Sequence, residues 1–401
     1  MISVEDARAR ILAGLSPTPA EIVALPQAAG RVTAAPVIAR LSQPPADLSA
    51  MDGYALRAAD GTAGSTLRQI GASPAGHPFA GTVGPGETVR LFTGSVVPEG
   101  ADSILLQEDA TAADGQVTVN ETVRPGRHIR RAGQDFAAGD TLIPAGEMLH
   151  ARLIGLAAAG NHPWLAVHRR PRVAILATGD EISLPGEPIG PGGIVSSNAH
   201  ALAALAAAAG ADPLVLPIAK DDRAAIAAVA DSLSGMDLLV STGGASVGDH
   251  DLVQAGFGQR GLALDFWKIA MRPGKPLMFG HLGAVPLLGL PGNPVSAMVC
   301  AVLFLLPALA RLSGRAGVAP PQEIAMLATV LPANDGRADH LRAGLARDSE
   351  GRFVASAFER QDSSMLRLLA GADALILRVP HAPAAPAGTM VDIIRLAPLG
   401  V

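Results

Sequence analysis

A glycine-rich stretch, TGGASVGDHD, directly follows the apolar run DLLVS and places side-chain-free positions next to acids. Gly243, Gly244 and Gly248 leave backbone N–H groups open to an anion and permit left-handed turns. The GK[ST] signature of a P-loop is missing from this stretch. An ordinary tight turn between a strand and a helix is the alternative explanation of the glycines. This stretch alone does not decide between an anion-binding loop and a tight turn.

Acids recur where other apolar runs end, and they favour a metal site. Glu181 closes TGDE, Asp221 lies in KDD, and Asp249 and Asp251 close the glycine-rich stretch. Carboxylates brought together repel one another unless a cation neutralises them. Magnesium binds through one or two carboxylates plus substrate phosphates. The alternative is that each acid caps a following helix, and this is the better interpretation for Asp222, which precedes RAAIAAV.

Lysine is scarce in this chain, and two lysines gather in one turn. Lysine occurs only at positions 220, 268 and 275, although lysine and arginine together number 31. FWKIAMRPGKPLMFG holds Lys268, Arg272 and Lys275 around a Pro-Gly turn. A role for a compact ammonium group that arginine cannot replace is one explanation of this retention. A solvated surface turn would account for one lysine but poorly for both, and Lys220 fits chance survival. Together with the acids and glycines, the turn indicates a site for a metal–phosphate group and a second, small oxyanion.

The apolar runs that must position these groups alternate with helical segments. RVAILA, PLVLPIA, DLLVS and VPLLGL are nearly continuous apolar strands, which is typical of a parallel sheet covered on both faces. A polar cluster follows each strand, and ligands bind at this carboxyl edge in open α/β sheets. The four clusters are TGDE (178–181), KDD (220–222), TGGASVGDHD (242–251) and PGNP (291–294).

Bulk composition narrows the class of protein. With 401 residues, 49% of them hydrophobic, the chain predicts more than one globular domain. A net charge of −5 gives no general attraction to nucleic acid or anionic membranes. The single cysteine, Cys300, excludes a disulfide framework and fits a reducing cytoplasm. The apolar run around it, which contains Pro307, predicts a buried helix. The stretch MISVEDARARILAGL predicts a capped amphipathic helix and has no charged-then-apolar signal architecture.

Several motifs in family order resemble the molybdopterin molybdenumtransferase family, and the resemblance covers nearly the whole chain. The glycine-rich stretch is shared with the related molybdopterin adenylyltransferases, which consist only of the α/β domain. The segments that decide for the molybdenumtransferases lie outside that domain. They are SAMDGYAL, RRAGQDFAAGD and the C-terminal strands. The matching segments are SAMDGYAL, LFTGSVVPEGADSILLQED, RRAGQDFAAGD, ATGDEI, SSNAHAL, STGGASVGDHD, WKIAMRPGKPLMFG and GLPGNPVSAM.

The resemblance implies an α/β plus β, multidomain fold with a doubly wound, mostly parallel sheet, an inserted N-terminal β domain and a C-terminal β-barrel. It also implies an elongated cytoplasmic homodimer with its cleft between subunits, so that SAMDGYAL of one chain faces the α/β domain of the other. The implied domains are an extended dimerisation domain (1–45 and 141–170), an inserted β domain (46–140), an α/β domain (171–320) and a barrel (321–401).

The implied reaction inserts molybdenum from molybdate into adenylated molybdopterin, with Mg²⁺-dependent cleavage of the pyrophosphate link and release of AMP. Its implied partners are the molybdopterin adenylyltransferase and downstream molybdoenzyme maturation proteins, with no nucleic acid and no membrane. The implied catalytic residues are Asp52, Glu181, Asp221, Lys268 and Lys275, and the implied metal ligands are Glu181, Asp221, Asp249 and Asp251. The implied substrate-binding residues are Thr93, Arg130, Asp135, Gly243, Gly244, Ser246, Arg272, Pro291 and Pro294.

The chain departs from the family pattern at two points. Arg272 stands where members often carry lysine, which keeps the charge but changes the geometry of oxyanion contacts. The spacing after SVGDHD is one residue longer than in some relatives, so either Asp249 or Asp251 is the functional acid.

Two other functions compete with the transferase. A molybdopterin adenylyltransferase would consume ATP and release pyrophosphate. A dimeric scaffold would bind partner peptides, as the E domain of gephyrin, the eukaryotic counterpart of the family, does for receptors. Such a scaffold would have no use for Glu181, Lys268 and Lys275.

Overall fold

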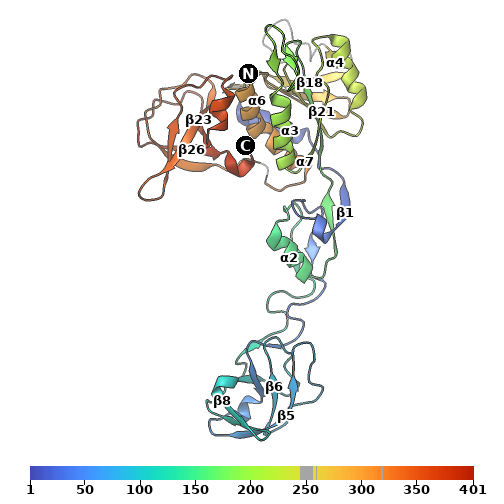
Figure 1. The fold of residues 1–401 in the computed structure, drawn as a ribbon, viewed down its shortest axis with the longest axis vertical. Coiled ribbons are helices and arrows are strands. Elements are labelled where there is room, and N and C mark those ends of the chain that lie inside the picture. Colours follow the sequence, from blue (N-terminus) through green and yellow to red (C-terminus); the bar gives the residue numbers. More distant parts are fainter. Residues whose placement is uncertain (244–255, 259, 318) are drawn as a thin grey trace.

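The computed structural model describes residues 1–243, 256–258, 260–317 and 319–401. The molecule is elongated: the α/β sheet and a C-terminal barrel lie at one end and a small β domain at the other (Figure 1). The chain begins at the sheet end, where α1 (Val4–Ala13) packs against α7 (Leu306–Leu312). Ser3 caps α1, as its hydroxyl accepts a hydrogen bond from the backbone N–H of Asp6 at 3.0 Å.

Antiparallel ribbons and one helix connect the two ends. The chain leaves along one strand of each ribbon and returns along the other, so segments far apart in sequence lie side by side (Figure 1). The ribbons pair β1 (Ala20–Ala24) with β12 (Trp164–His168), β2 (Val37–Ile38) with β11 (Thr141–Ile143), and β3 (Leu48–Ser49) with β10 (Ile129–Arg130), and the helix is α2 (Ala151–Ala159).

The small β domain is a six-stranded sheet in the order β7-β4-β6-β5-β9-β8. Its alternating and β-branched runs form short strands that bury Tyr54, Leu56 and Leu105 on one side and Val89, Leu91 and Ile104 on the other. The strands are β4 (Gly53–Leu56), β5 (Thr66–Ser73), β6 (Glu87–Leu91), β7 (Ser103–Leu106), β8 (Ala110–Ala113) and β9 (Gln116–Val119).

The α/β domain contains the predicted doubly wound sheet. Its strand order is β16-β13-β17-β21-β20-β18; the first four strands are parallel, and β20 runs antiparallel to both of its neighbours, β21 and β18. The order reverses between β13 and β17, so ligands are expected at the carboxyl ends of these two strands. The strands are β13 (Arg172–Ala177), β16 (Asp212–Val215), β17 (Leu238–Thr242), β18 (Leu262–Trp267), β20 (Met278–Leu282) and β21 (Val285–Leu290).

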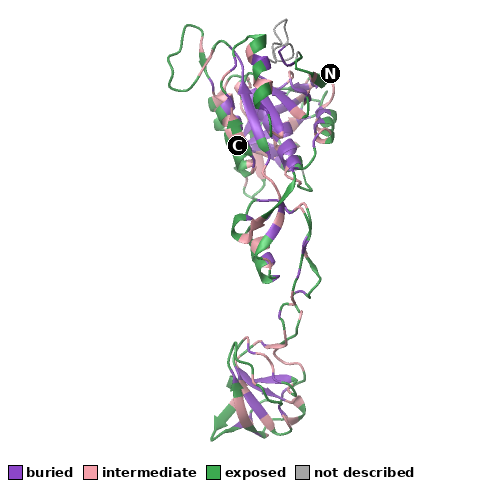
Figure 2. Cartoon of the chain, turned by 90° about the vertical axis from the view of Figure 1, so that its right-hand side faces the viewer, coloured by how far each residue is buried: buried purple, intermediate pink, exposed green. Residues whose placement is uncertain are grey.

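Both faces of this sheet are covered, which explains the continuous apolar strands; Figure 2 shows them as the buried interior of this end of the molecule. α1, α3 (Asn198–Ala208), α6 (Pro294–Cys300) and α7 cover one face, and α4 (Arg223–Val229) covers the other. Residues 294–312 form a helix that could cross a membrane by length and composition, but 89% of it is buried in the protein. This is the buried helix that the sequence predicts. Short strands β14 (Ile182–Ser183) and β15 (Ile194–Val195) pair beside the sheet.

The C-terminal region is a closed barrel, because five strands pair in a ring with β23 contacting both β24 and β25. A short strand of the α/β domain, β19 (Met271–Arg272), adds in parallel to β23. It joins the barrel to the turn that holds Lys268, Arg272 and Lys275, the cationic turn. The predicted fold class is therefore confirmed. The barrel elements are β22 (Glu323–Leu327), β23 (Ala338–Arg347), β24 (Phe353–Ala357), α8 (Leu366–Ala370), β25 (Ala374–Arg378) and β26 (Met390–Arg395).

Candidate active site

The loops after three parallel strands meet at the carboxyl edge of the sheet. A Cβ added to Gly243 would lie only 2.4 Å from the carbonyl oxygen of Thr178, and Gly243 has a φ of +91°. A Cβ on Gly292 would lie 3.5 Å from the Cα of Gly243. Glycine is therefore required at position 243 by both conformation and space. The first residues of the glycine-rich cluster therefore contact both the TGDE cluster and the PGNP cluster.

The fourth cluster joins them from β16. Thr178 forms an isolated β-bridge with Ala219, and Asp180 Oδ1 accepts a hydrogen bond from the backbone N–H of Asp221 at 3.1 Å. Asp222 caps α4, because its carboxylate accepts hydrogen bonds from the backbone N–H groups of Ala224 and Ala225. The capping interpretation of Asp222 is confirmed, and Asp221 lies beside the TGDE loop.

Glu181 is exposed and its carboxylate folds back over Gly179. A Cβ on Gly179 would lie 2.7 Å from Oε2 of Glu181, and the φ of Gly179 is +147°. Among the described residues, no group of three or more His, Cys, Asp or Glu side chains is placed to hold a metal ion. Two hard carboxylates on adjacent loops, Glu181 and Asp221, nevertheless suit magnesium, which needs few protein ligands when phosphates complete its shell. Gly244, Ser246, Asp249 and Asp251 lie outside the described residues.

The two lysines and the arginine of the cationic turn have different partners. Lys268 has a φ of +70°, and its ammonium nitrogen lies 3.7 Å from the ring centre of Trp267. Neither Lys268 nor Lys275 forms a salt bridge in the described part of the chain. Arg272 instead donates two hydrogen bonds to Asp339 of the barrel, at 2.9 and 2.7 Å. The lysines remain available to an oxyanion, while the arginine fork is occupied by a carboxylate.

Cys300 lies beneath this turn. A Cβ on Gly274 would lie 2.5 Å from its sulfur. Burial raises the pKa of the Cys300 thiol, so the thiol stays protonated. This agrees with a core side chain.

One polar residue at the edge of the sheet, Asn198, was not singled out from the sequence. Asn198, the first residue of α3, donates hydrogen bonds to Thr242 Oγ1 at 2.9 Å and to the carbonyl oxygen of Gly292 at 2.8 Å. The only sequence signal was an asparagine at the start of a helix, SSNAHAL, which also fits a simple cap. The two predicted prolines belong to the PGNP turn. Pro291 is buried, and Pro294 is the first residue of α6.

The site residues predicted in the N-terminal half lie at or near the small β domain, away from the sheet edge within this chain (Figure 1). Asp52 Oδ1 accepts hydrogen bonds from the hydroxyl of Thr93 at 2.8 Å and from its backbone N–H at 2.7 Å. These bonds hold the pKa of Asp52 below its ordinary value. Arg130 and Asp135 are exposed on the connecting ribbon, where Arg130 pairs with Leu48.

Replacing Thr93 by valine is expected to raise the pKa of Asp52 toward its ordinary value, because the hydroxyl donor is lost while the backbone donor remains. A carbon-13 NMR titration of the carboxyl group measures this shift. Since the folded-state pKa is lowered, the pair stabilises the fold above the ordinary aspartate pKa and loses its effect as the pH falls through the lowered value. Thr93→Ser should keep the wild-type titration. An unchanged pKa in Thr93→Val would contradict the assignment.

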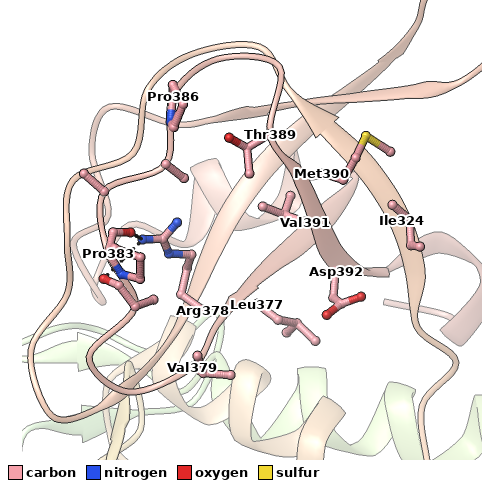
Figure 3. Close-up of a pocket in the computed structure, with 13 residues that line it drawn as sticks. Ile324, Leu377, Arg378, Val379, Pro383, Pro386, Thr389, Met390, Val391 and Asp392 are labelled. Atoms are coloured by element: carbon pink, nitrogen blue, oxygen red, sulfur yellow. Dashed lines mark hydrogen bonds between the residues drawn. The ribbon is translucent and has the colours of Figure 1, made fainter.

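A hollow of about 360 Å³ lies on the barrel and not at this edge (Figure 3). Leu377, Val391 and Met390 line it with apolar atoms. Arg378 beside them donates hydrogen bonds to the backbone carbonyl groups of Ala382 and Pro383 and to that of Pro332 on a separate segment. No candidate residue lines this hollow, so it takes no part in the site.

Comparison with known families covers almost the whole chain. The model of the MoeA N-terminal region (domain I and II) matches residues 2–160. The model described as a probable molybdopterin binding domain matches residues 174–311, and that of the MoeA C-terminal region (domain IV) matches residues 325–396. The second of these contains all four loops of the sheet edge.

Curated relatives and solved structures agree with these matches. A molybdopterin molybdenumtransferase of Haemophilus influenzae is 33% identical over 397 residues, which is 98% of each chain. Molybdopterin molybdenumtransferase 2 of Mycobacterium tuberculosis is 36% identical over 383 residues, covering 92% of this chain and 94% of that one. The crystal structure of a molybdopterin biosynthesis MoeA protein from Pyrococcus horikoshii superimposes with a TM-score of 0.86 at 26% identity, over 98% of this chain and 99% of that one.

Proposed function

Because this chain belongs to the molybdopterin molybdenumtransferase family, we propose that it inserts molybdenum from molybdate into adenylated molybdopterin and releases AMP. Membership makes it an enzyme of molybdenum cofactor biosynthesis. The observation that carries the finer proposal is the meeting of Thr178, Gly243 and Gly292 at one edge of the sheet.

The charges around this edge suit an anhydride substrate. Glu181 and Asp221 would hold magnesium, which when bound would neutralise charge on the pyrophosphate link. The glycine-rich turn that begins at Gly243 would hold a phosphate group through its backbone N–H groups. Lys268 and Lys275, free of carboxylate partners in the described residues, would hold molybdate or the terminal phosphate. Pro291 and Pro294 would bound the pterin end.

The separation of Asp52 from the sheet edge supports a cleft shared between two protomers. Within one chain the two groups lie at opposite ends (Figure 1), so a second copy must supply one of them if both act. The β1–β12 ribbon offers an apolar face for such a partner. Ile22 and Trp164 lie on the same side of the ribbon and are 68% and 58% exposed. We therefore propose a homodimer, acting in the cytoplasm.

The test supplies adenylated molybdopterin, magnesium and molybdate to the purified protein and measures AMP. AMP release that requires molybdate supports the proposal. Consumption of ATP with release of pyrophosphate would identify an adenylyltransferase instead. A protein that shows neither reaction but retains partner peptides would be a scaffold.

A further inference from the structure

Asn198 connects two of the loops that form the proposed site. Its amide nitrogen donates to the hydroxyl of Thr242, the last residue of β17, and to the carbonyl oxygen of Gly292 in the turn after β21. The Thr242 hydroxyl in turn donates to the carbonyl oxygen of Pro291 at 3.2 Å. The start of α3, the end of β17 and the PGNP turn therefore share one hydrogen-bonded network.

This network has a fixed direction. Both amide hydrogens of Asn198 are used, and the Thr242 hydroxyl accepts one hydrogen bond and donates another. Thr242 is 2% exposed, so removing either partner leaves buried polar groups without a bond. An aspartate at position 198 would place carboxylate oxygens against the Gly292 carbonyl, where only a donor fits.

The network ends where the glycine-rich turn and the PGNP turn touch. Gly243 follows Thr242 directly, and its Cα is the nearest atom to a Cβ built on Gly292, at 3.5 Å. The spacing between the glycine-rich turn and the PGNP turn thus depends on what Asn198 and Thr242 hold. We propose that Asn198 is a positioning residue, which keeps these two turns at the separation that the phosphate and pterin parts of the substrate require.

This inference rests on the proposed function and deepens it. A purely structural role for Asn198 would lower the thermal midpoint or the fraction of active enzyme without changing the KM of the active molecules. A positioning role changes the KM for adenylated molybdopterin, because the turns that contact the substrate move relative to each other.

The test measures KM and kcat from molybdate-dependent AMP release, together with thermal melting, for Asn198→Ala, Thr242→Val, Thr242→Ser and the double variant Asn198→Ala/Thr242→Val. We expect KM to rise about tenfold in Asn198→Ala and in Thr242→Val, and to rise no further in the double variant, because both substitutions break one network. Thr242→Ser keeps the hydroxyl and should restore a nearly native KM.

The matched control is Asn120→Ala, which removes a similar bond from Asn120 to Thr111, of 3.1 Å, in the small β domain. Its KM should equal that of the wild type. A native KM in Asn198→Ala, in a preparation whose wild type releases AMP, overturns the positioning role alone. A wild type that releases no AMP overturns the proposed function, and this inference with it.

Discussion

Replacing Glu181 by glutamine is expected to lower molybdate-dependent AMP release by about 100-fold, which corresponds to roughly 3 kcal/mol of transition-state stabilisation. Glutamine keeps the size of the side chain but loses the negative charge that a hard cation requires. The Glu181 carboxylate is exposed and lies over Gly179, so the thermal midpoint should not change. AMP is measured by chromatography at saturating magnesium.

Glu187 provides a control from the same loop. It is exposed, and its carboxylate accepts a hydrogen bond from the backbone N–H of Leu184 at 2.8 Å. Glu187→Gln should release AMP within about twofold of the wild type, as is typical of surface substitutions. Equal release from the wild type and from Glu181→Gln would remove Glu181 from the mechanism.

Mixing two inactive variants tests whether the cleft is shared. Asp52→Asn and Glu181→Gln would each inactivate every site of their own homodimer. If Asp52 of one chain works with Glu181 of the other, a mixed dimer has one intact site, and an equal mixture regains about a quarter of the native activity. Activity that stays at the level of the separate variants would place both residues in one chain's site, or exclude one of them.

Replacing Arg272 by methionine is expected to lower the free energy of unfolding by about 2–3 kcal/mol, because it leaves the buried carboxylate of Asp339 without the two hydrogen bonds that Arg272 donates. Asp339 is only 4% exposed and accepts two hydrogen bonds from the Arg272 guanidinium. The same pair joins β19 of the α/β domain to β23 of the barrel. Denaturant unfolding measures the loss. Arg272→Lys keeps the charge but not the two hydrogen bonds of the guanidinium, and should recover part of the lost stability.

The exposed ion pair of Arg260 and Asp231 is the matched control for Arg272→Met. Arg260 forms two hydrogen bonds with Asp231, at 3.1 and 3.0 Å, but both side chains are exposed. Arg260→Met should therefore change stability by less than about 1 kcal/mol. If Arg272→Met keeps native stability and instead raises the KM for molybdate, Arg272 binds the oxyanion, and its bond to Asp339 is incidental.

The amino-acid pattern alone determined the layout of the chain. Continuous apolar runs predicted a parallel sheet covered on both faces, and short alternating runs predicted β structure on either side of it. Polar clusters after RVAILA, PLVLPIA, DLLVS and VPLLGL located the edge where the loops meet. These features are local, since side-chain period and strand ends are properties of neighbouring residues. The resemblance to the family added the domain order.

Only the tertiary structure decided which side chains are paired. Arg272 and Lys275 lie close together in the sequence, yet Arg272 is bound to Asp339, 67 positions away, whereas Lys275 has no carboxylate partner among the described residues. Asn198 reaches Gly292, 94 positions away, and Asp52 lies far from the edge within its own chain (Figure 1). Hydrogen bonds and ion pairs depend on distances of about 3 Å between atoms that folding brings together, and sequence spacing does not encode these distances.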